Sequence, residues 1–202
     1  MAEELEIKLL VNGLSKSEVL ARLAELFPGD DLAQSELINI YFDTPELILN
    51  QKKVALRVRK KGDQFIQTLK TQGVVENGVH RRGEWEWSLP SASLNSELLE
   101  RCEAWPTEIA IETLKAVFET NFRRYKLLLD CDNAKIELVF DCGEVLAGGA
   151  TERLFEIELE LLSGDEQALF TLKDRLSARL PLSASDISKA ERGYKLFLGS
   201  QA

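Results

Sequence analysis

Charged and apolar side chains alternate in seven segments of the chain. A period of two residues is typical of β-strands, in which successive side chains point to opposite faces, so each segment predicts a strand with one charged face and one apolar face. Together with a strand rich in β-branched and aromatic residues, the predicted strands are residues 3–10, 35–44, 54–61, 65–70, 82–89, 117–129, 135–142 and 154–161. Their short connections favour antiparallel pairing.

Helical patterns lie between and after these strands. Ser15 and Glu18 form a Ser-x-x-Glu capping box, which predicts a helix that ends at Pro28. The other expected helical segments are a short turn at 46–50, fragments at 94–102 and 108–115, and longer helices at 166–180 and 188–198. The dipeptides at 132–133 and 148–149 are typical of turns between strands.

Composition indicates one soluble domain over residues 1–202, with 45% hydrophobic and 29% charged residues. No apolar run approaches the ~18 residues of a membrane span, and the acidic start does not resemble a signal peptide. A formal net charge of −9 argues against nucleic acid or an anionic membrane as the main partner. Cys102, Cys131 and Cys142 are odd in number and lack metal-ligand spacing, which favours unpaired thiols in a reducing cytoplasm.

Strands with one apolar and one charged face fit two architectures. In a β-sandwich the apolar faces meet and the charged faces point to bulk water. In a closed barrel the apolar faces pack outward against helices, and the charged faces line the interior. The sandwich is the more common arrangement for amphipathic strands.

The composition of the charged faces favours the barrel. Glu156, Glu158 and Glu160 lie in line on one strand, and such a row costs free energy unless cations lie against it. Arg57 and Arg59 suit bidentate contacts with phosphate oxygens. An interior that carries both acidic and basic rows fits a polyanion that binds together with divalent metal. A solvated sandwich remains the alternative at this point.

Several motifs identify a family resemblance over nearly the whole length. They are Glu4-Leu5-Glu6-Ile7-Lys8, Tyr41-Phe42-Asp43-Thr44-Pro45, Leu56-Arg57-Val58-Arg59, Thr68-Leu69-Lys70, Arg82 with Glu84, Arg124 with Lys126, Asp141, Glu156-Ile157-Glu158-Leu159-Glu160, and Ser188-Lys189 with Arg192-Gly193-Tyr194. In this order they resemble the CYTH superfamily, the triphosphate tunnel metalloenzymes, and most closely its bacterial inorganic triphosphatases. Many similar proteins carry a second, helical domain, which we expect to be absent from this chain or removed.

The resemblance implies an α+β fold, in which an eight-stranded antiparallel barrel forms a tunnel with a charged lumen and helices packed outside. It implies hydrolysis of inorganic triphosphate to diphosphate and phosphate by metal-activated water, with two divalent ions, Mg²⁺ or Mn²⁺. The alternatives are a class IV adenylate cyclase, a thiamine triphosphatase and a non-catalytic module that binds polyphosphate or nucleotide. The expected protein is cytoplasmic and is a monomer or a homodimer.

The resemblance also implies residue roles. The expected metal ligands are Glu4, Glu6, Glu84, Asp141, Glu156, Glu158 and Glu160. A first metal would use Glu4, Glu6 and Glu158, and a second would use Glu84, Asp141 and Glu160. The expected substrate-binding residues are Lys8, Arg57, Arg59, Lys70, Arg82, Arg124, Lys126, Lys189 and Arg192, and the catalytic set is Lys8, Glu84, Asp141 and Glu160. Glu86 and Glu137 lie outside the family pattern, so the sequence favours neither a surface role nor a site role for them.

Overall fold

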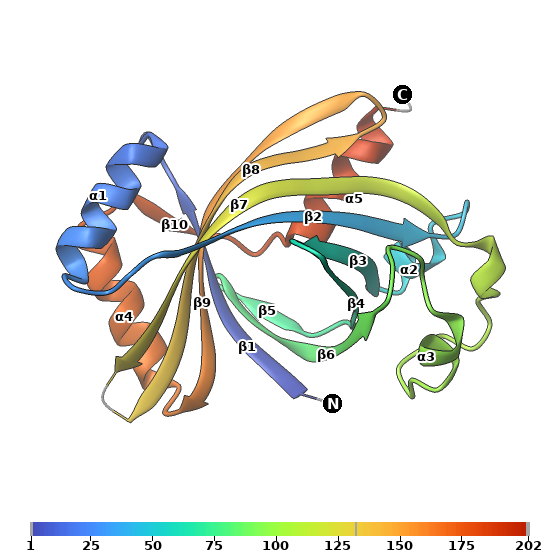
Figure 1. Cartoon of the computed structure of the whole chain (residues 1–202), viewed down its shortest axis with the longest axis horizontal. Helices are drawn as coiled ribbons and strands as arrows, with labels where there is room; N and C mark the ends of the chain where they lie inside the picture. The colour runs from blue at the N-terminus through green and yellow to red at the C-terminus, as the bar shows by residue number, and fades with distance from the viewer. Residues whose placement is uncertain (1, 132, 201–202) are drawn as a thin grey trace.

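The computed structural model describes residues 2–131 and 133–200, and Figure 1 shows the arrangement of the chain. Its elements in chain order are β1 (Ala2–Val11), α1 (Lys16–Leu26), β2 (Ala33–Asp43), α2 (Ile48–Gln51), β3 (Ala55–Lys61), β4 (Gln64–Lys70), β5 (Val74–Glu76), β6 (Val79–Leu89), α3 (Ser96–Glu100), a 3₁₀ turn η1 (Ile111–Thr113), β7 (Lys115–Cys131), β8 (Ala134–Ala147), β9 (Ala150–Gly164), α4 (Gln167–Ser177), β10 (Leu182–Ala184) and α5 (Lys189–Gly199). The turn predicted at 132–133 includes a residue outside the described ranges.

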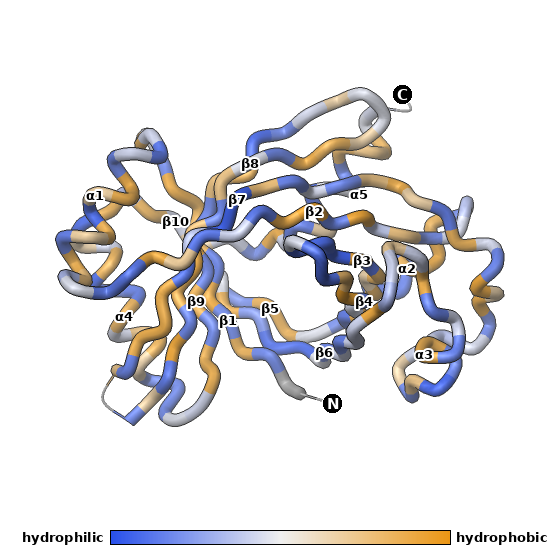
Figure 2. The backbone as a smooth tube through the Cα atoms, in the orientation of Figure 1, coloured by the Kyte–Doolittle hydropathy of each residue, from blue (hydrophilic) through white to orange (hydrophobic). Residues whose placement is uncertain are grey.

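Eight strands close into an antiparallel barrel. The hydrogen-bonded order is β1-β9-β8-β7-β2-β3-β4-β6, and β6 pairs back with β1 to complete the circuit. The short strands β5 and β10 extend this sheet beside β6 and β1. The predicted closed barrel is therefore confirmed and the sandwich is excluded. Figure 2 shows hydrophilic and hydrophobic positions alternating along the strands, as a wall with two different faces requires.

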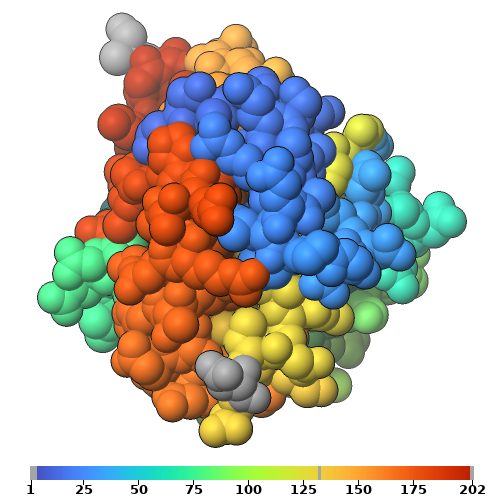
Figure 3. Space-filling view, turned by 90° about the vertical axis from the view of Figure 1, so that its left-hand side faces the viewer, coloured from blue at the N-terminus to red at the C-terminus, as the bar shows by residue number. Residues whose placement is uncertain are grey.

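Helices α1 and α4 cover one side of the barrel, where they lie next to each other (Figures 1 and 3). Leu23 of α1 and Leu172 of α4 belong to the same buried cluster as Ile7 of β1 and Leu138 of β8. The two helices are also joined directly, because the Arg175 side chain donates a hydrogen bond to the last carbonyl of α1 at 2.6 Å. The predicted capping box at the start of α1 is present. These contacts stabilise the outer face of β1, β7, β8 and β9.

A second apolar cluster covers the outer face of β3, β4 and β6. Leu56 and Leu69 of the barrel wall pack with Leu99 of α3 and with Trp105 in the loop that follows. The two predicted helical fragments in this region are shorter than expected, since only α3 and the η1 turn form regular helix. The loop between them is held by apolar packing and local backbone hydrogen bonds. This region supports the basic strand β3 from outside.

Helix α5 packs against β7, β8 and β9 and brings its first turn to the interior of the barrel. Its buried Tyr194 donates a 2.8 Å hydrogen bond to Asp43 at the end of β2. The Asp43 carboxylate also accepts hydrogen bonds from three backbone N–H groups in and before α2. Gly193 permits the close approach, because a Cβ at this position would lie 2.1 Å from the ring of Phe118. The family motifs Tyr41-Phe42-Asp43-Thr44-Pro45 and Arg192-Gly193-Tyr194 therefore serve to anchor α5 to the end of β2.

The structure has two strands beyond those expected, and it can be compared with two further expectations. Strands β5 and β10 were not predicted, because segments of three residues are too short to show a period of two. None of the three cysteines forms a disulfide in the described part of the chain. Within the same residues, no helix is long and apolar enough to cross a lipid bilayer.

Candidate active site

The interior of the barrel holds a cavity of about 270 Å³ whose wall is strongly charged. Among the described residues, seven carboxylates and seven cationic side chains line it: Glu4, Glu6, Glu84, Glu86, Glu137, Glu158, Glu160, Lys8, Arg57, Arg59, Lys70, Arg82, Arg124 and Lys189. Taking charged groups out of bulk water costs several kcal/mol per ion unless they are well paired. A fold that gathers so many of them in its interior therefore retains them for a purpose other than stability.

Strand register explains how these side chains meet. Lys8 of β1 lies opposite Glu158 of β9, and Glu6 lies opposite Glu160 on the same pair of strands. On the other edge of β1, Glu4 lies opposite Arg82 of β6. Directly opposed residues of antiparallel strands point to the same face. The first motif of the chain therefore brings its own charges together with those of two distant strands.

The carboxylates of β1 are tightly paired with cations. The Nζ atom of Lys8 lies 2.7 Å from Glu6 and 2.6 Å from Glu158. Arg82 joins Glu4 and Glu6 at 3.0 and 2.7 Å, and Lys70 lies 2.8 Å from Glu4. Burial alone would raise the pKa of Glu4, but the charges of Lys70, Arg82 and Lys8 hold it well below its ordinary value. Glu4 and Glu6 are therefore ionised at neutral pH.

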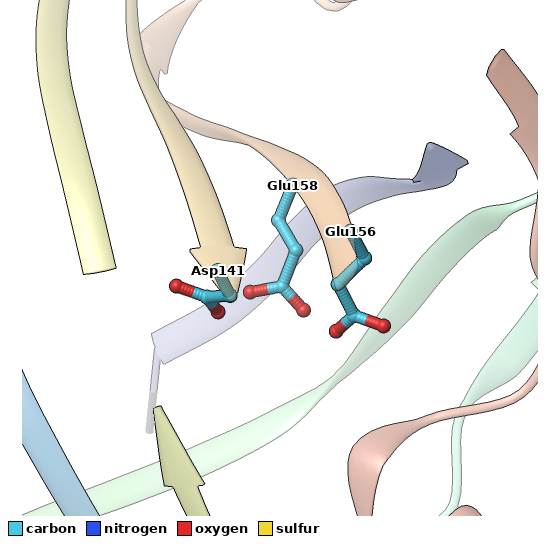
Figure 4. Close-up of side chains that lie close together, drawn as sticks. All are labelled: Asp141, Glu156 and Glu158. Atoms are coloured by element: carbon cyan, nitrogen blue, oxygen red, sulfur yellow. The ribbon is translucent and has the colours of Figure 1, made fainter. Parts of the chain in front are cut away.

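A second acidic group lies beside the first turn of α5. Asp141 of β8 and Glu156 and Glu158 of β9 point toward one another in Figure 4. Each offers an oxygen within 4.8 Å of the others, which makes them the only such acidic group found in the residues that the structure describes. The ammonium group of Lys189 lies 2.8, 2.5 and 2.9 Å from Asp141, Glu156 and Glu158. Lys189 therefore contacts all three carboxylates of the group at once.

Two arginines add to this ionic network. Arg124 of β7 contacts Asp141 through Nε at 2.8 Å and Nη2 at 2.7 Å, and it reaches Glu158 at 3.0 Å. Arg192, one turn after Lys189 in α5, contacts Glu156 at 3.3 Å and Glu152 through Nε at 2.7 Å. Burial disfavours the charged carboxylate, but Lys189 and the other nearby cations hold the pKa of Glu158 far below its ordinary value.

The basic wall formed by β3 has few counter-ions. The closest carboxylate oxygens to Arg57 are those of Glu86 and Glu84, at 3.8 and 3.9 Å. The buried Nε of Arg57 has no hydrogen-bond partner among the described residues. Arg59 has a lowered pKa of about 9, because it is buried and lies near the positive charges of Arg57 and Arg124. This wall carries an excess of positive charge in the absence of a ligand.

Glu160 is the opposite case, a carboxylate without a close cation. No ion pair within 4.0 Å connects it to any residue in the described ranges. Burial raises the pKa of Glu160 to about 7, and the nearby Glu4 and Glu137 charges add to the effect. Burial also raises the pKa of Glu84, which lies 3.2 Å from Lys70. Hard carboxylate oxygens with unneutralised charge are suitable ligands for Mg²⁺ or Mn²⁺, so the donor set fits a divalent cation.

Comparison with known proteins identifies the family. A CYTH domain matches residues 2–194. The chain belongs to the CYTH family. It is 34% identical over 203 residues to an inorganic triphosphatase of Haemophilus influenzae, a match that covers 97% of this chain and 55% of that protein. The chain thus spans about half the length of this curated relative.

Solved structures support the CYTH fold. A candidate adenylyl cyclase from Hippeastrum, reported to have a dominant triphosphatase activity, has a TM-score of 0.70 and 23% identity, with 95% of each chain covered. A candidate adenylate cyclase from Bacillus halodurans has a TM-score of 0.59 and 24% identity, with 93% of this chain and 96% of that chain covered. At these identities the likeness concerns the fold alone.

The structure brings most of the expected CYTH site residues to the cavity. Lys126, Asp141, Glu156 and Arg192 are the expected residues that do not line it. Asp141 and Glu156 are buried in contact with Lys189, whereas Lys126 is paired with Glu137 at 2.5 Å. Neither expected metal trio, Glu4 with Glu6 and Glu158 or Glu84 with Asp141 and Glu160, forms one compact group in the described residues.

Five polar residues that line the cavity were not among the expected site residues. They are Tyr41, Thr68, Glu86, Glu137 and Ser188. The period of two along the strands indicated two of them, because Glu86 shares a face of β6 with Glu84, and Glu137 shares a face of β8 with Asp141. In the structure Glu137 also lies opposite Glu160 across the β8–β9 pair. Thr68 donates a 3.0 Å hydrogen bond to Glu86, which links these two residues on the cavity wall.

Proposed function

We propose that this CYTH chain hydrolyses inorganic triphosphate to diphosphate and phosphate, with a divalent metal ion as cofactor. The observation that carries the proposal is the cavity in which seven carboxylates face seven cationic side chains among the described residues. Triphosphate carries four to five negative charges near neutral pH, and two divalent cations neutralise most of them. A balanced cavity therefore accommodates the polyanion and its metal ions together with little net change in charge.

In this proposal the basic residues of the site would bind phosphate, and the acidic residues would bind metal. Arg57 and Arg59 would bind phosphate oxygens through their guanidinium groups, since these cations have no close carboxylate to satisfy them. Lys8, Lys70 and Arg82 would stabilise charge that develops on the bridging and leaving oxygens. When bound, a divalent ion supplies charge neutralisation and lowers the pKa of water. The candidate metal-binding residues are Glu4, Glu6, Glu84, Asp141, Glu156, Glu158 and Glu160.

No covalent intermediate is required in this proposal. Water attacks a terminal phosphorus in line with the leaving diphosphate, the new P–O bond forms as the P–O bond to diphosphate breaks, and the water proton is lost to solvent or to a carboxylate of the wall. The barrel contributes position and electrostatics, because its cations are fixed by strand pairing before the substrate arrives.

Phosphate release is the direct test. Purified protein would be incubated with triphosphate, diphosphate, ATP and thiamine triphosphate, each with EDTA, Mg²⁺ or Mn²⁺. We expect release from triphosphate that depends on metal and exceeds release from the other three. Binding of triphosphate without phosphate release under every metal condition would contradict the enzymatic proposal and favour a non-catalytic polyphosphate-binding module.

One observation supports an organic triphosphate as the second candidate substrate. A further hollow of about 330 Å³ adjoins the charged cavity and shares Lys70 and Arg82 with it. Val54, Val74 and Tyr194 give it a more apolar wall. An aromatic group attached to the triphosphate would find apolar contacts there. Faster turnover of ATP or thiamine triphosphate than of inorganic triphosphate would favour this candidate, and formation of cyclic AMP would identify a cyclase.

A further inference from the structure

Two of the seven cavity cations differ from the rest in their partners. Lys8, Lys70, Arg82, Arg124 and Lys189 each have a carboxylate oxygen within 2.8 Å. Arg57 has none closer than 3.8 Å, and Arg59 forms no ion pair within 4.0 Å of any described carboxylate. The two lie on the same face of β3, so the chain places its least neutralised positive charge at one place on the wall.

A neutral side chain holds Arg59, whereas carboxylates hold five of the other cavity cations. The Oδ1 atom of Asn39 accepts a 2.7 Å hydrogen bond from Nε of Arg59. Asn39 is fully buried on β2, where it lies opposite Arg59 of β3 on one edge and opposite Thr120 of β7 on the other. The strand pairing therefore brings these three polar side chains into one row across the barrel wall.

Thr120 determines which way the Asn39 amide points. The Nδ2 atom of Asn39 lies 2.9 Å from the backbone carbonyl oxygen of Thr120 and 3.1 Å from its hydroxyl. A carbonyl oxygen can only accept, so the NH₂ group must face Thr120 and the amide oxygen must face Arg59. The guanidinium is thus held through Nε alone, and both of its Nη groups lack protein partners among the described residues.

We propose that Asn39 is a positioning residue that aims the Arg59 guanidinium at the substrate and, because it is uncharged, leaves the Arg57–Arg59 pair positively charged to bind a phosphate group. An aspartate of the same shape would make the same contact with Nε and would cancel the charge that the phosphate needs. The Asn39 amide orients the Arg59 guanidinium without neutralising its charge. This inference rests on the proposed function, since it assigns the phosphate-binding end of the same cavity.

Asn39→Asp tests the charge component. We expect the Kd for metal-free triphosphate, measured by calorimetry, and the KM in the metal-dependent assay to rise by roughly 10- to 100-fold. We expect kcat to change much less, because the reacting groups are untouched. Asn39→Ala tests the orientation component, since it removes the contact with Arg59 but adds no charge, and its effect on Kd should be smaller than that of the aspartate.

Gln67→Glu is a matched control. Gln67 is also fully buried, accepts a hydrogen bond from the backbone N–H of Asn95 at 2.8 Å, and donates to the Asn95 carbonyl at 3.3 Å. The change introduces the same charge into the same kind of amide site, but the side-chain hydrogen bonds of Gln67 in the described residues go to the Asn95 backbone and not to a cation of the cavity. It should lower the melting temperature to a similar extent as Asn39→Asp and leave the Kd for triphosphate unchanged.

The outcomes separate the two proposals. If wild-type protein binds triphosphate and Asn39→Asp binds it within about twofold of wild type, the role of Asn39 is contradicted and the proposed function is not affected. If Asn39→Asp does not fold, Asn39→Ala decides, and a Kd equal to that of wild type overturns the inference. If wild type binds triphosphate without hydrolysis, the enzymatic proposal fails and the Asn39 comparison is still read from Kd. If wild type does not bind triphosphate, both fail.

Discussion

The ammonium group of Lys189 lies 2.5 Å from a carboxylate oxygen of Glu156, and both side chains are buried. Lys189 is the first residue of α5, and its ammonium group also lies 2.8 Å from Asp141 and 2.9 Å from Glu158. Burial disfavours the charged ammonium, but the nearby carboxylates more than offset this and raise the pKa of Lys189 above its ordinary value. The contact therefore links the helix to β8 and β9 at the wall of the cavity.

Lys189→Met should destabilise the metal-free protein by about 3–5 kcal/mol, because it leaves buried carboxylates without their shared counter-ion. The free energy of unfolding from urea titration in EDTA measures the effect. Lys195→Met is the control, since Lys195 is an exposed lysine of the same helix and its replacement should change stability by less than about 0.5 kcal/mol. Equal effects of the two substitutions would contradict a structural role of the Lys189 contacts.

Gly193 should be intolerant of even a methyl group. A Cβ at this position would lie 2.1 Å from the ring of Phe118, which is stacked on Tyr41 at 4.5 Å between centroids and cannot easily move. We expect Gly193→Ala to cost about 1–3 kcal/mol or more through overpacking, despite the better helix propensity of alanine. Gly199→Ala is the matched control in the same helix, because a Cβ added there would meet no atom within 4 Å. It should be neutral or slightly stabilising in thermal unfolding.

Arg57 and Arg192 were both expected to bind substrate, and their surroundings now predict different results. Arg57 lines the cavity with an unpartnered Nε, whereas Arg192 is paired with Glu152 and Glu156. Arg57→Gln should raise KM for triphosphate by roughly 10- to 100-fold, because a charge-assisted contact with phosphate is lost. Arg192→Gln should change KM by less than about threefold and act mainly on stability. Steady-state kinetics at saturating metal distinguish these cases, and a larger KM effect at Arg192 would reverse the assignment.

The barrel could be predicted from sequence because its main determinant is local. A period of two along Glu4-Leu5-Glu6-Ile7-Lys8 needs no knowledge of the rest of the fold, and the sorted charges indicated that the polar face was enclosed. Which charges neutralise one another could not be predicted, since that depends on register between distant strands. The pairing of Lys8 with Glu158, the isolation of Glu160 and the contact of Asn39 with Arg59 are all of this kind.

Glu160 allows a prediction about pH in the absence of metal. Its pKa in the folded protein is about 7, compared with an ordinary value of 4.5, because burial and nearby carboxylates disfavour the charge. A raised carboxyl pKa means that the folded state holds the proton more tightly, so its stabilising contribution is complete below pH 4.5 and is lost as the pH rises through 7. Ionised Glu160 therefore weakens the metal-free fold at pH 8.

Glu160→Gln should remove this loss, because glutamine has a similar shape and does not ionise. With allowance for partial solvent screening, we expect the variant to be more stable than wild type by about 1–2 kcal/mol at pH 8 in EDTA, and the two to be closely similar at pH 4.5. Urea titrations across this range measure the difference. Glu4→Gln is the contrasting control, since Glu4 is paired with Lys70 and Arg82 and its loss should destabilise at pH 8. Parallel stability curves for wild type and Glu160→Gln between pH 4.5 and 8 would show that Glu160 is not an unneutralised carboxylate.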